Sequence, residues 1–204
     1  MKRFLQGLML AAAFAGGAAQ AVPMLYSTTL SGAAENPPNA SPGSGSALLT
    51  YDALAHTLRV QADFMDLLGN VTAAHIHCCT PAPGNVGVAV MPPSLTGFPL
   101  GVTSGTYDQT FDLTDLGSYS ASFVTNFGGG TEAGAEAALV AGLDAGQAYF
   151  NIHTSVFGGG EIRGFLAPQA AVPEPQTLAL VGGGLLLIGL MASWRPRASR
   201  SKAG

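Results

Sequence analysis

Residues 56–64, HTLRVQADF, decide the fold class of this chain. Apolar side chains at Leu58, Val60, Ala62 and Phe64 alternate with polar ones, so one face of the segment is apolar and the other is polar. A period of two over such a stretch is typical of a half-buried β-strand. We therefore expect a strand here, with one side turned to a core and the other to solvent.

Further short strands are predicted on both sides of this one. They lie at residues 24–31, 43–51, 71–77, 86–90, 106–113, 147–154 and 160–167. Residues 132–143 are the one helix expected between the two ends of the chain, because Ala135, Leu139 and Leu143 recur at helical spacing. Many short strands separated by Gly- and Pro-rich turns predict an all-β domain, an antiparallel Greek-key-like β-sandwich with one short helix.

Both ends of the chain carry targeting patterns. Lys2 and Arg3 precede an apolar run, and the small-x-small sequence at residues 19–21 follows it, so residues 1–21 are predicted to be a secretory signal peptide cleaved after Ala21. Residues 177–194 carry no charge and are nearly long enough to cross a hydrocarbon core as a transmembrane helix. Four cations in residues 195–204 would hold that end on the cytoplasmic side of the membrane.

A short motif, Pro173-Glu174-Pro175, lies in the predicted linker at residues 169–176, just before the apolar segment. The order of motif, apolar helix and basic tail resembles the PEP-CTERM sorting signal of Gram-negative bacteria. The resemblance implies export through signal peptidase, an inner-membrane anchor, and processing by an exosortase-type membrane protease. It also implies a final place at the cell surface or in an extracellular matrix, because bacteria with such signals often make exopolysaccharide and biofilm.

The domain between these ends, residues 22–168, is acidic. Between residues 22 and 172, eleven Asp and Glu face only two cations, Arg59 and Arg163, which gives a formal charge of −9. Such a surface repels nucleic acid, and it repels anionic polysaccharide unless divalent cations intervene. We therefore exclude nucleic-acid binding. The sequence also lacks a phosphate-binding loop, a dinucleotide fingerprint, a nucleophile elbow and an HExxH motif.

Four segments of the domain carry a family resemblance. They are residues 30–38 (LSGAAENPP), 72–77 (TAAHIH), 149–154 (YFNIHT) and 159–166 (GGEIRGFL). Their order and spacing resemble the CHRD domain, named for chordin and found in many bacterial secreted proteins. The resemblance implies an extracellular β-sandwich module with no established catalytic activity. Asn36 departs from the Val that the family often has, and Cys78-Cys79 departs from its common Gly-Pro.

Three histidines, His75, His77 and His153, are candidate metal ligands. His75 and His77 are two residues apart on a predicted strand, so their side chains leave the same face roughly 6–7 Å apart. His153 lies on a later strand, on the polar face that it shares with Tyr149 and Asn151. If the two polar faces meet, the three imidazoles converge, and three His ligands plus a water suit zinc or copper.

Two interpretations of the histidines stay open. In the first they bind a metal, with Asp66 or a cysteine thiolate as a further ligand; the His-x-His pattern is similar to that of copper/zinc superoxide dismutase. In the second, each ring is hydrogen-bonded within a polar layer whose partners are Asn151, Thr72 and Thr154.

Cys78 and Cys79 are the only cysteines of the chain. An oxidising compartment favours pairing, and neighbouring residues can close a vicinal disulfide, although its ring departs from ordinary disulfide geometry. Free or intermolecular thiols and metal thiolates remain alternatives.

One further pair is a candidate contact, and the patterns together suggest a function. Glu161 and Arg163 share a face of the last predicted strand and are expected to form an ion pair or a buried structural contact, or else to bind a carboxylate or a sugar. The function expected from the sequence is that of an exported, non-enzymatic CHRD-domain protein with a structural or interaction role in matrix or biofilm. The alternative is a metal-dependent, superoxide-dismutase-like oxidoreductase that uses the histidines.

Overall fold

The computed structural model describes residues 22–170. The predicted signal peptide with Ala21, the Pro173-Glu174-Pro175 motif, the transmembrane helix and the basic tail lie outside the described residues. Within the described part, no helix is both long enough and apolar enough to span a membrane.

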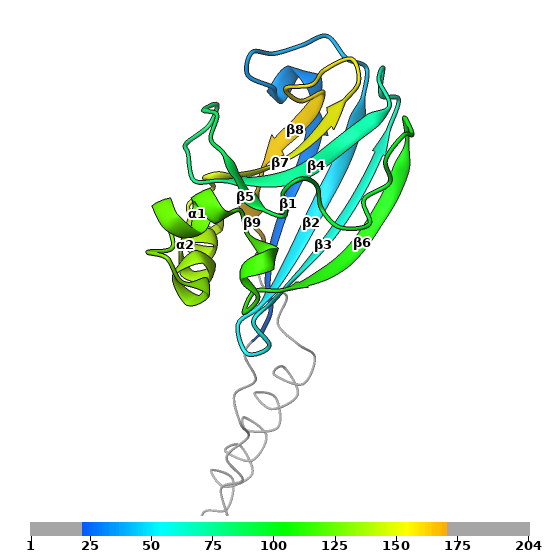
Figure 1. Cartoon of the computed structure of the whole chain (residues 1–204). Helices are drawn as coiled ribbons and strands as arrows, with labels where there is room; N and C mark the ends of the chain where they lie inside the picture. The colour runs from blue at the N-terminus through cyan, green and yellow to red at the C-terminus, as the bar shows by residue number, and fades with distance from the viewer. Residues whose placement is uncertain (1–21, 171–204) are drawn as a thin grey trace, which may run out of the picture.

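Nine antiparallel strands form one hydrogen-bonded sheet (Figure 1). They are β1 Met24–Ser31, β2 Ser44–Asp52, β3 Thr57–Met65, β4 Val71–Cys78, β5 Val88–Val90, β6 Gly105–Asp112, β7 Ala148–Thr154, β8 Ile162–Phe165 and β9 Ala167–Pro168. The spatial order is β5-β4-β7-β8-β1-β2-β3-β6, and β9 pairs with β1 outside this path.

This single sheet corrects the prediction of a two-sheet sandwich. The strand β8 pairs with β7 on one side and, through Arg163 and Ser31, with β1 on the other, so it joins the two halves into one sheet. The sheet is curled, and the inner faces of its two halves share one apolar core. Phe98 bridges them, with ring centroids 5.5 Å from Phe64 of β3 and 6.2 Å from Phe150 of β7.

The alternation of residues 56–64 has the expected consequence in β3. Leu58, Val60, Ala62 and Phe64 are buried in the core, while the residues between them are partly or fully exposed. This strand pairs along its whole length with β2 and over nearly all of it with β6.

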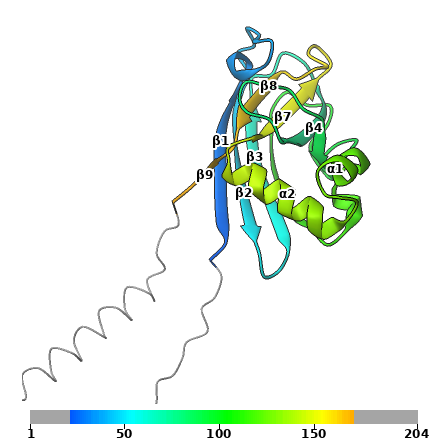
Figure 2. The same ribbon diagram turned by 90° about the vertical axis from the view of Figure 1, so that its left-hand side faces the viewer.

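Two α-helices are present among the described residues, where the sequence predicted one. The predicted helix is α2, Glu132–Asp144, which starts at Thr131, whose hydroxyl accepts a hydrogen bond from the Gly134 amide. The additional helix, α1, Ala121–Asn126, is capped in the same way by Ser120. Short 3-10 helices occur at η1, Gly32–Ala34, and η2, Leu116–Ser118. Figure 2 shows α1 and α2 next to each other beside the curled sheet, and α2 contacts β4, β7 and β9.

The strands β4 and β7 are buried on both faces, unlike β3. Their inner face is apolar and belongs to the core, with Ala74, Ile76, Phe150 and Ile152 all fully buried. Their other face carries polar side chains, which are hydrogen-bonded to loops that lie over it. This second, polar layer between β4, β7, β8 and the covering loops holds the candidate site.

Candidate metal site

The register between β4 and β7 brings the three predicted histidines together. His75 lies opposite Asn151, and His153 lies opposite Ala73, so His153 is diagonal to His75 on the same face of the sheet. The ring centroid of His75 is 5.7 Å from that of His77 and 5.0 Å from that of His153, and those of His77 and His153 are 6.0 Å apart. One nitrogen from each ring can be chosen so that all three atoms lie within 4.8 Å of one another.

One nitrogen of each imidazole is fixed by a backbone carbonyl. The Nε2 of His75 is 2.7 Å from the oxygen of Pro93, the Nδ1 of His77 is 2.8 Å from that of Val86, and the Nδ1 of His153 is 3.0 Å from that of Gly158. A carbonyl oxygen only accepts hydrogen bonds, so each of these nitrogens must carry the proton. The remaining nitrogen of each neutral ring therefore has a free lone pair.

These three remaining nitrogens are buried and have no hydrogen-bond partner. They are Nδ1 of His75, Nε2 of His77 and Nε2 of His153. The polar-layer interpretation thus accounts for one nitrogen of each ring and leaves the other unpaired. The partners expected from sequence are also not the ones used, because three backbone carbonyls take their place. Thr154, for example, donates to Glu161.

The surroundings keep all three rings neutral. Burial lowers the pKa of His75, His77 and His153, and the carbonyl contacts oppose this only in part. For His77, where the two neighbouring imidazoles lower it further, the pKa falls to about 4. Neutral imidazole is the form that binds a metal ion, so the cluster can bind one at neutral pH without first losing protons.

The further ligands considered from sequence are not part of this cluster. Cys78 and Cys79 are joined by a disulfide, so neither sulfur is a thiolate. The disulfide packs against α2 at Gly142, where no Cβ could be accommodated. Asp66 is exposed in the turn after β3, and the candidate ligand group in the described residues contains histidines alone.

Tyr149 connects the histidine cluster to a second polar network. Its ring stacks on that of His77, with centroids 4.6 Å apart and planes 3° from parallel. Its hydroxyl donates to the same Val86 oxygen that accepts from His77. The guanidinium carbon of Arg163 lies 4.9 Å from the centroid of the Tyr149 ring.

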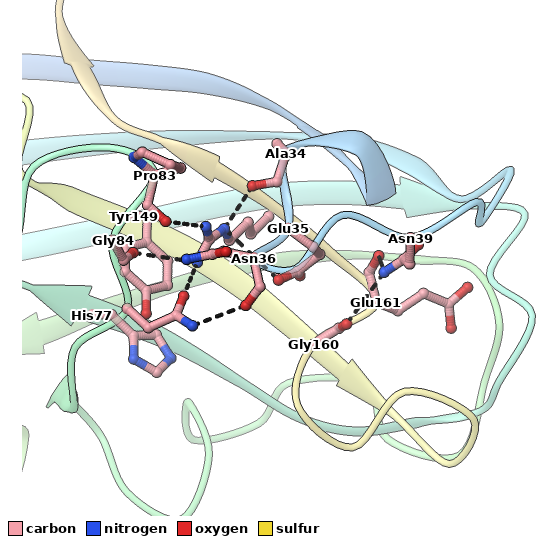
Figure 3. A network of polar contacts seen from close by, with 12 residues as sticks. Ala34, Glu35, Asn36, Asn39, His77, Pro83, Gly84, Tyr149, Gly160 and Glu161 are labelled. Carbon is pink, nitrogen blue, oxygen red and sulfur yellow. Dashed lines mark hydrogen bonds and ion pairs between the residues drawn. The ribbon is translucent and has the colours of Figure 1, made fainter.

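Arg163 is the centre of that second network, and Figure 3 labels its partners Ala34, Pro83 and Glu35. Its side chain is 1 % exposed, and it donates from Nε to the Ala34 oxygen at 2.7 Å, from Nη1 to Oδ1 of Asn85 at 2.6 Å, and from Nη2 to the Pro83 oxygen at 2.8 Å. The nearest carboxylate is that of Glu35, 3.7 Å from Nε. Burial raises the pKa of Glu35 to about 7, although Arg163 and the Asn36 amide lower it.

Glu161 and Arg163 do not form an ion pair with each other, but both side chains make buried structural contacts, which was the other part of the expectation. Glu161 precedes β8 and is buried, and its carboxylate accepts hydrogen bonds from the hydroxyls of Ser41 and Thr154 and from the amides of Leu68 and Gly69. Burial by itself would raise the pKa of Glu161, but these four donors lower it overall. Glu161 thus holds the loops that contain Ser41 and Leu68 against the end of β7. The carboxylate beside Arg163 is that of Glu35.

Comparison with known proteins gives the family. The CHRD domain family matches residues 26–166, which is more than half of the chain, and the chain belongs to that family. The match covers all four segments on which the sequence resemblance rested. No match was found among curated proteins or among solved structures.

Proposed function

We propose that this chain is an exported, non-enzymatic CHRD-domain protein that binds one zinc or copper ion at His75, His77 and His153. Its role is structural or interactive, in the cell envelope or the extracellular matrix. The observation that carries the metal assignment is the convergence of three imidazoles, each of which has one buried nitrogen with a free lone pair and no partner.

A metal ion satisfies this arrangement better than water or protons do. Unpaired buried acceptors cost about 1–3 kcal/mol each. A single water has only two hydrogens to donate, so it would leave one of the three nitrogens unpaired. A proton would create a buried cation beside two other rings, which the lowered pKa values oppose. One ion accepts all three lone pairs at about 2.0–2.1 Å after small inward shifts of the rings.

The carbonyl contacts support the same assignment. Metal-bound histidines usually donate their other N–H to a carbonyl or a carboxylate, which fixes the ring and its tautomer. All three rings have such a contact, to loops that are separate in the sequence. The family match names a domain and no reaction. Binding is therefore the better proposal than the superoxide-dismutase-like oxidoreductase.

The proposed export rests on the two ends of the chain and on the disulfide. The signal peptide pattern and the Pro173-Glu174-Pro175 motif imply signal peptidase and an exosortase-type protease as processing partners, with a membrane anchor before processing. A disulfide between Cys78 and Cys79 suits an oxidising compartment outside the cytoplasm. The formal charge of −9 between residues 22 and 172 suits a matrix in which divalent cations connect acidic surfaces.

Metal titration tests the proposal. Chelator-treated protein should bind one Zn²⁺ or Cu²⁺ per chain in calorimetry, and a hundredfold excess over Kd should stabilise it by about 2.7 kcal/mol. For a domain of this size, that raises the thermal midpoint by roughly 5–10 °C. The variants His75→Gln and His153→Gln should lose the binding and the stabilisation.

His56→Gln is the matched control, because His56 is half exposed and pairs with Glu136 at 2.9 Å, away from the cluster. It should bind the metal as the wild type does. Folded wild-type protein without stoichiometric binding would overturn the proposal. So would an equal loss of binding in His56→Gln and His75→Gln.

A further inference from the structure

A second candidate site lies in a pocket of about 280 Å³ near the end of β1. One wall is the loop at residues 35–39, with Pro37 and Pro38, and the other is the loop between β7 and β8, with Phe157, Gly159 and Gly160. Asn39 links the two loops, because its side-chain amide donates a hydrogen bond to the backbone oxygen of Glu161 at 3.0 Å. The pocket contains none of the histidines of the metal site.

Two unpartnered acceptors lie beneath this pocket. Glu35 and Asn151 are 5 % and 3 % exposed, and Oε1 of the first and Oδ1 of the second have no hydrogen-bond partner. Both oxygens lie 2.6 Å from the position that a Cβ on Gly160 would take, so they face the same point under that glycine. Both oxygens are buried, Gly160 places no side chain beside them, and Glu35 and Gly160 line the pocket.

The remaining chemistry of the pocket favours a neutral ligand. Glu35 is the only ionisable residue in its lining, and the Arg163 guanidinium, 3.7 Å away, offsets its charge. Two prolines and a phenylalanine supply apolar surface against which the C–H faces of a ring can pack. Unpaired acceptors below and apolar walls beside them suit a ring that carries hydroxyl donors.

We propose that this pocket binds a neutral sugar residue, with a sugar hydroxyl as the donor to Glu35. The proposal deepens the matrix role proposed above and names the polysaccharide unit that this domain would contact. It does not depend on the metal ion, because different residues form the two sites.

Two neighbouring glycines provide a sharp test. A Cβ added at Gly158 or at Gly159 would meet no atom within 4 Å, and neither residue has a positive φ, so both accept a side chain without strain in the fold. Only Gly159 lines the pocket. Gly159→Leu should therefore obstruct the pocket, and Gly158→Leu is the matched control.

Binding of the methyl glycosides of glucose, galactose and mannose to the full chain can be measured by saturation-transfer NMR. At least one glycoside should bind the wild type and Gly158→Leu equally. Gly159→Leu and Glu35→Met should bind it about tenfold more weakly, because the leucine side chain would occupy part of the pocket and methionine has no oxygen to accept from the sugar hydroxyl. The wild type, Gly159→Leu and Glu35→Met should keep their metal affinity.

Three results would overturn the inference: no glycoside binds at tens of millimolar, Gly159→Leu binds as well as Gly158→Leu, or glucuronate or a polyamine binds better than every neutral glycoside. The His75→Gln variant separates the two proposals, because it lacks one proposed metal ligand and keeps every residue that lines the pocket. Sugar binding without metal binding refutes only the metal site, and metal binding without sugar binding refutes only the pocket.

Discussion

Replacing Arg163 with lysine should strongly destabilise the domain, although the charge is kept. The guanidinium makes three short hydrogen bonds in different directions, to Ala34, Asn85 and Pro83, and its side chain is 1 % exposed. A lysine ammonium is a compact point charge that lacks the planar fork of arginine. It can keep one of these contacts, so the buried cation loses the other two hydrogen bonds.

The expected magnitude follows from those two lost hydrogen bonds. At about 1.5–3 kcal/mol for each hydrogen bond to a charged group, Arg163→Lys should lower the free energy of unfolding by about 3 kcal/mol. A domain of this size loses about 2–4 °C of its thermal midpoint per kcal/mol, so the midpoint should fall by roughly 6–12 °C.

Urea unfolding followed by far-UV circular dichroism measures this change. The slope of the free energy against urea should be the same in both proteins, which allows direct comparison of their midpoints. Arg59→Lys is the matched control, because Arg59 is the other arginine of the domain and forms an exposed pair with Asp108. Its midpoint should stay close to that of the wild type, since exposed pairs contribute little. A loss below about 1 kcal/mol for Arg163→Lys, or an equal loss in the control, would refute the reasoning.

Two further predictions concern processing and pH. Protein recovered from the cell surface should lack residues 1–21 and the C-terminal apolar segment in intact-mass spectrometry, and Trp194 retained in the matrix-associated form would contradict this. The pKa of Glu35 rises from its ordinary 4.5 to about 7 on folding, so the folded chain holds the additional proton between these values. The free energy of unfolding of the wild type should therefore fall by up to about 3 kcal/mol relative to that of Glu35→Gln as the pH rises from 4.5 to about 7. Equal dependence of the two proteins on pH in urea unfolding would contradict this prediction.

The strands could be predicted from sequence because alternation is a local property. The strands predicted at residues 24–31 and 71–77 match β1 and β4 to within one residue. The alternating segment at residues 56–64 corresponds to β3. The joining of the two halves into one sheet could not be predicted this way. It depends on β8, a strand of four residues whose pairing with both β7 and β1 is long-range. The helix α1 was missed because six residues are too few for a helical period to emerge.

The histidine cluster was predictable in part. Spacing placed His75 and His77 on one face, and alternation placed His153 on the polar face of its strand. Their hydrogen-bond partners were not predictable, because Pro93, Val86 and Gly158 contribute backbone oxygens that every residue type has. The partner of Arg163 was misassigned for a related reason. Proximity in sequence favoured Glu161 among eleven acidic residues, whereas the fold selected Glu35, far away in the chain.

The four segments that carry the CHRD resemblance meet in the polar layer. Residues 30–38 supply Glu35 and the Ala34 oxygen, residues 72–77 and 149–154 supply the histidines and Tyr149, and residues 159–166 supply Arg163. Buried polar groups are a weak source of stability, because well-packed apolar side chains in their place are often as stable or more so. The proposed metal and sugar sites would give the polar residues of this layer in this chain a role beyond packing.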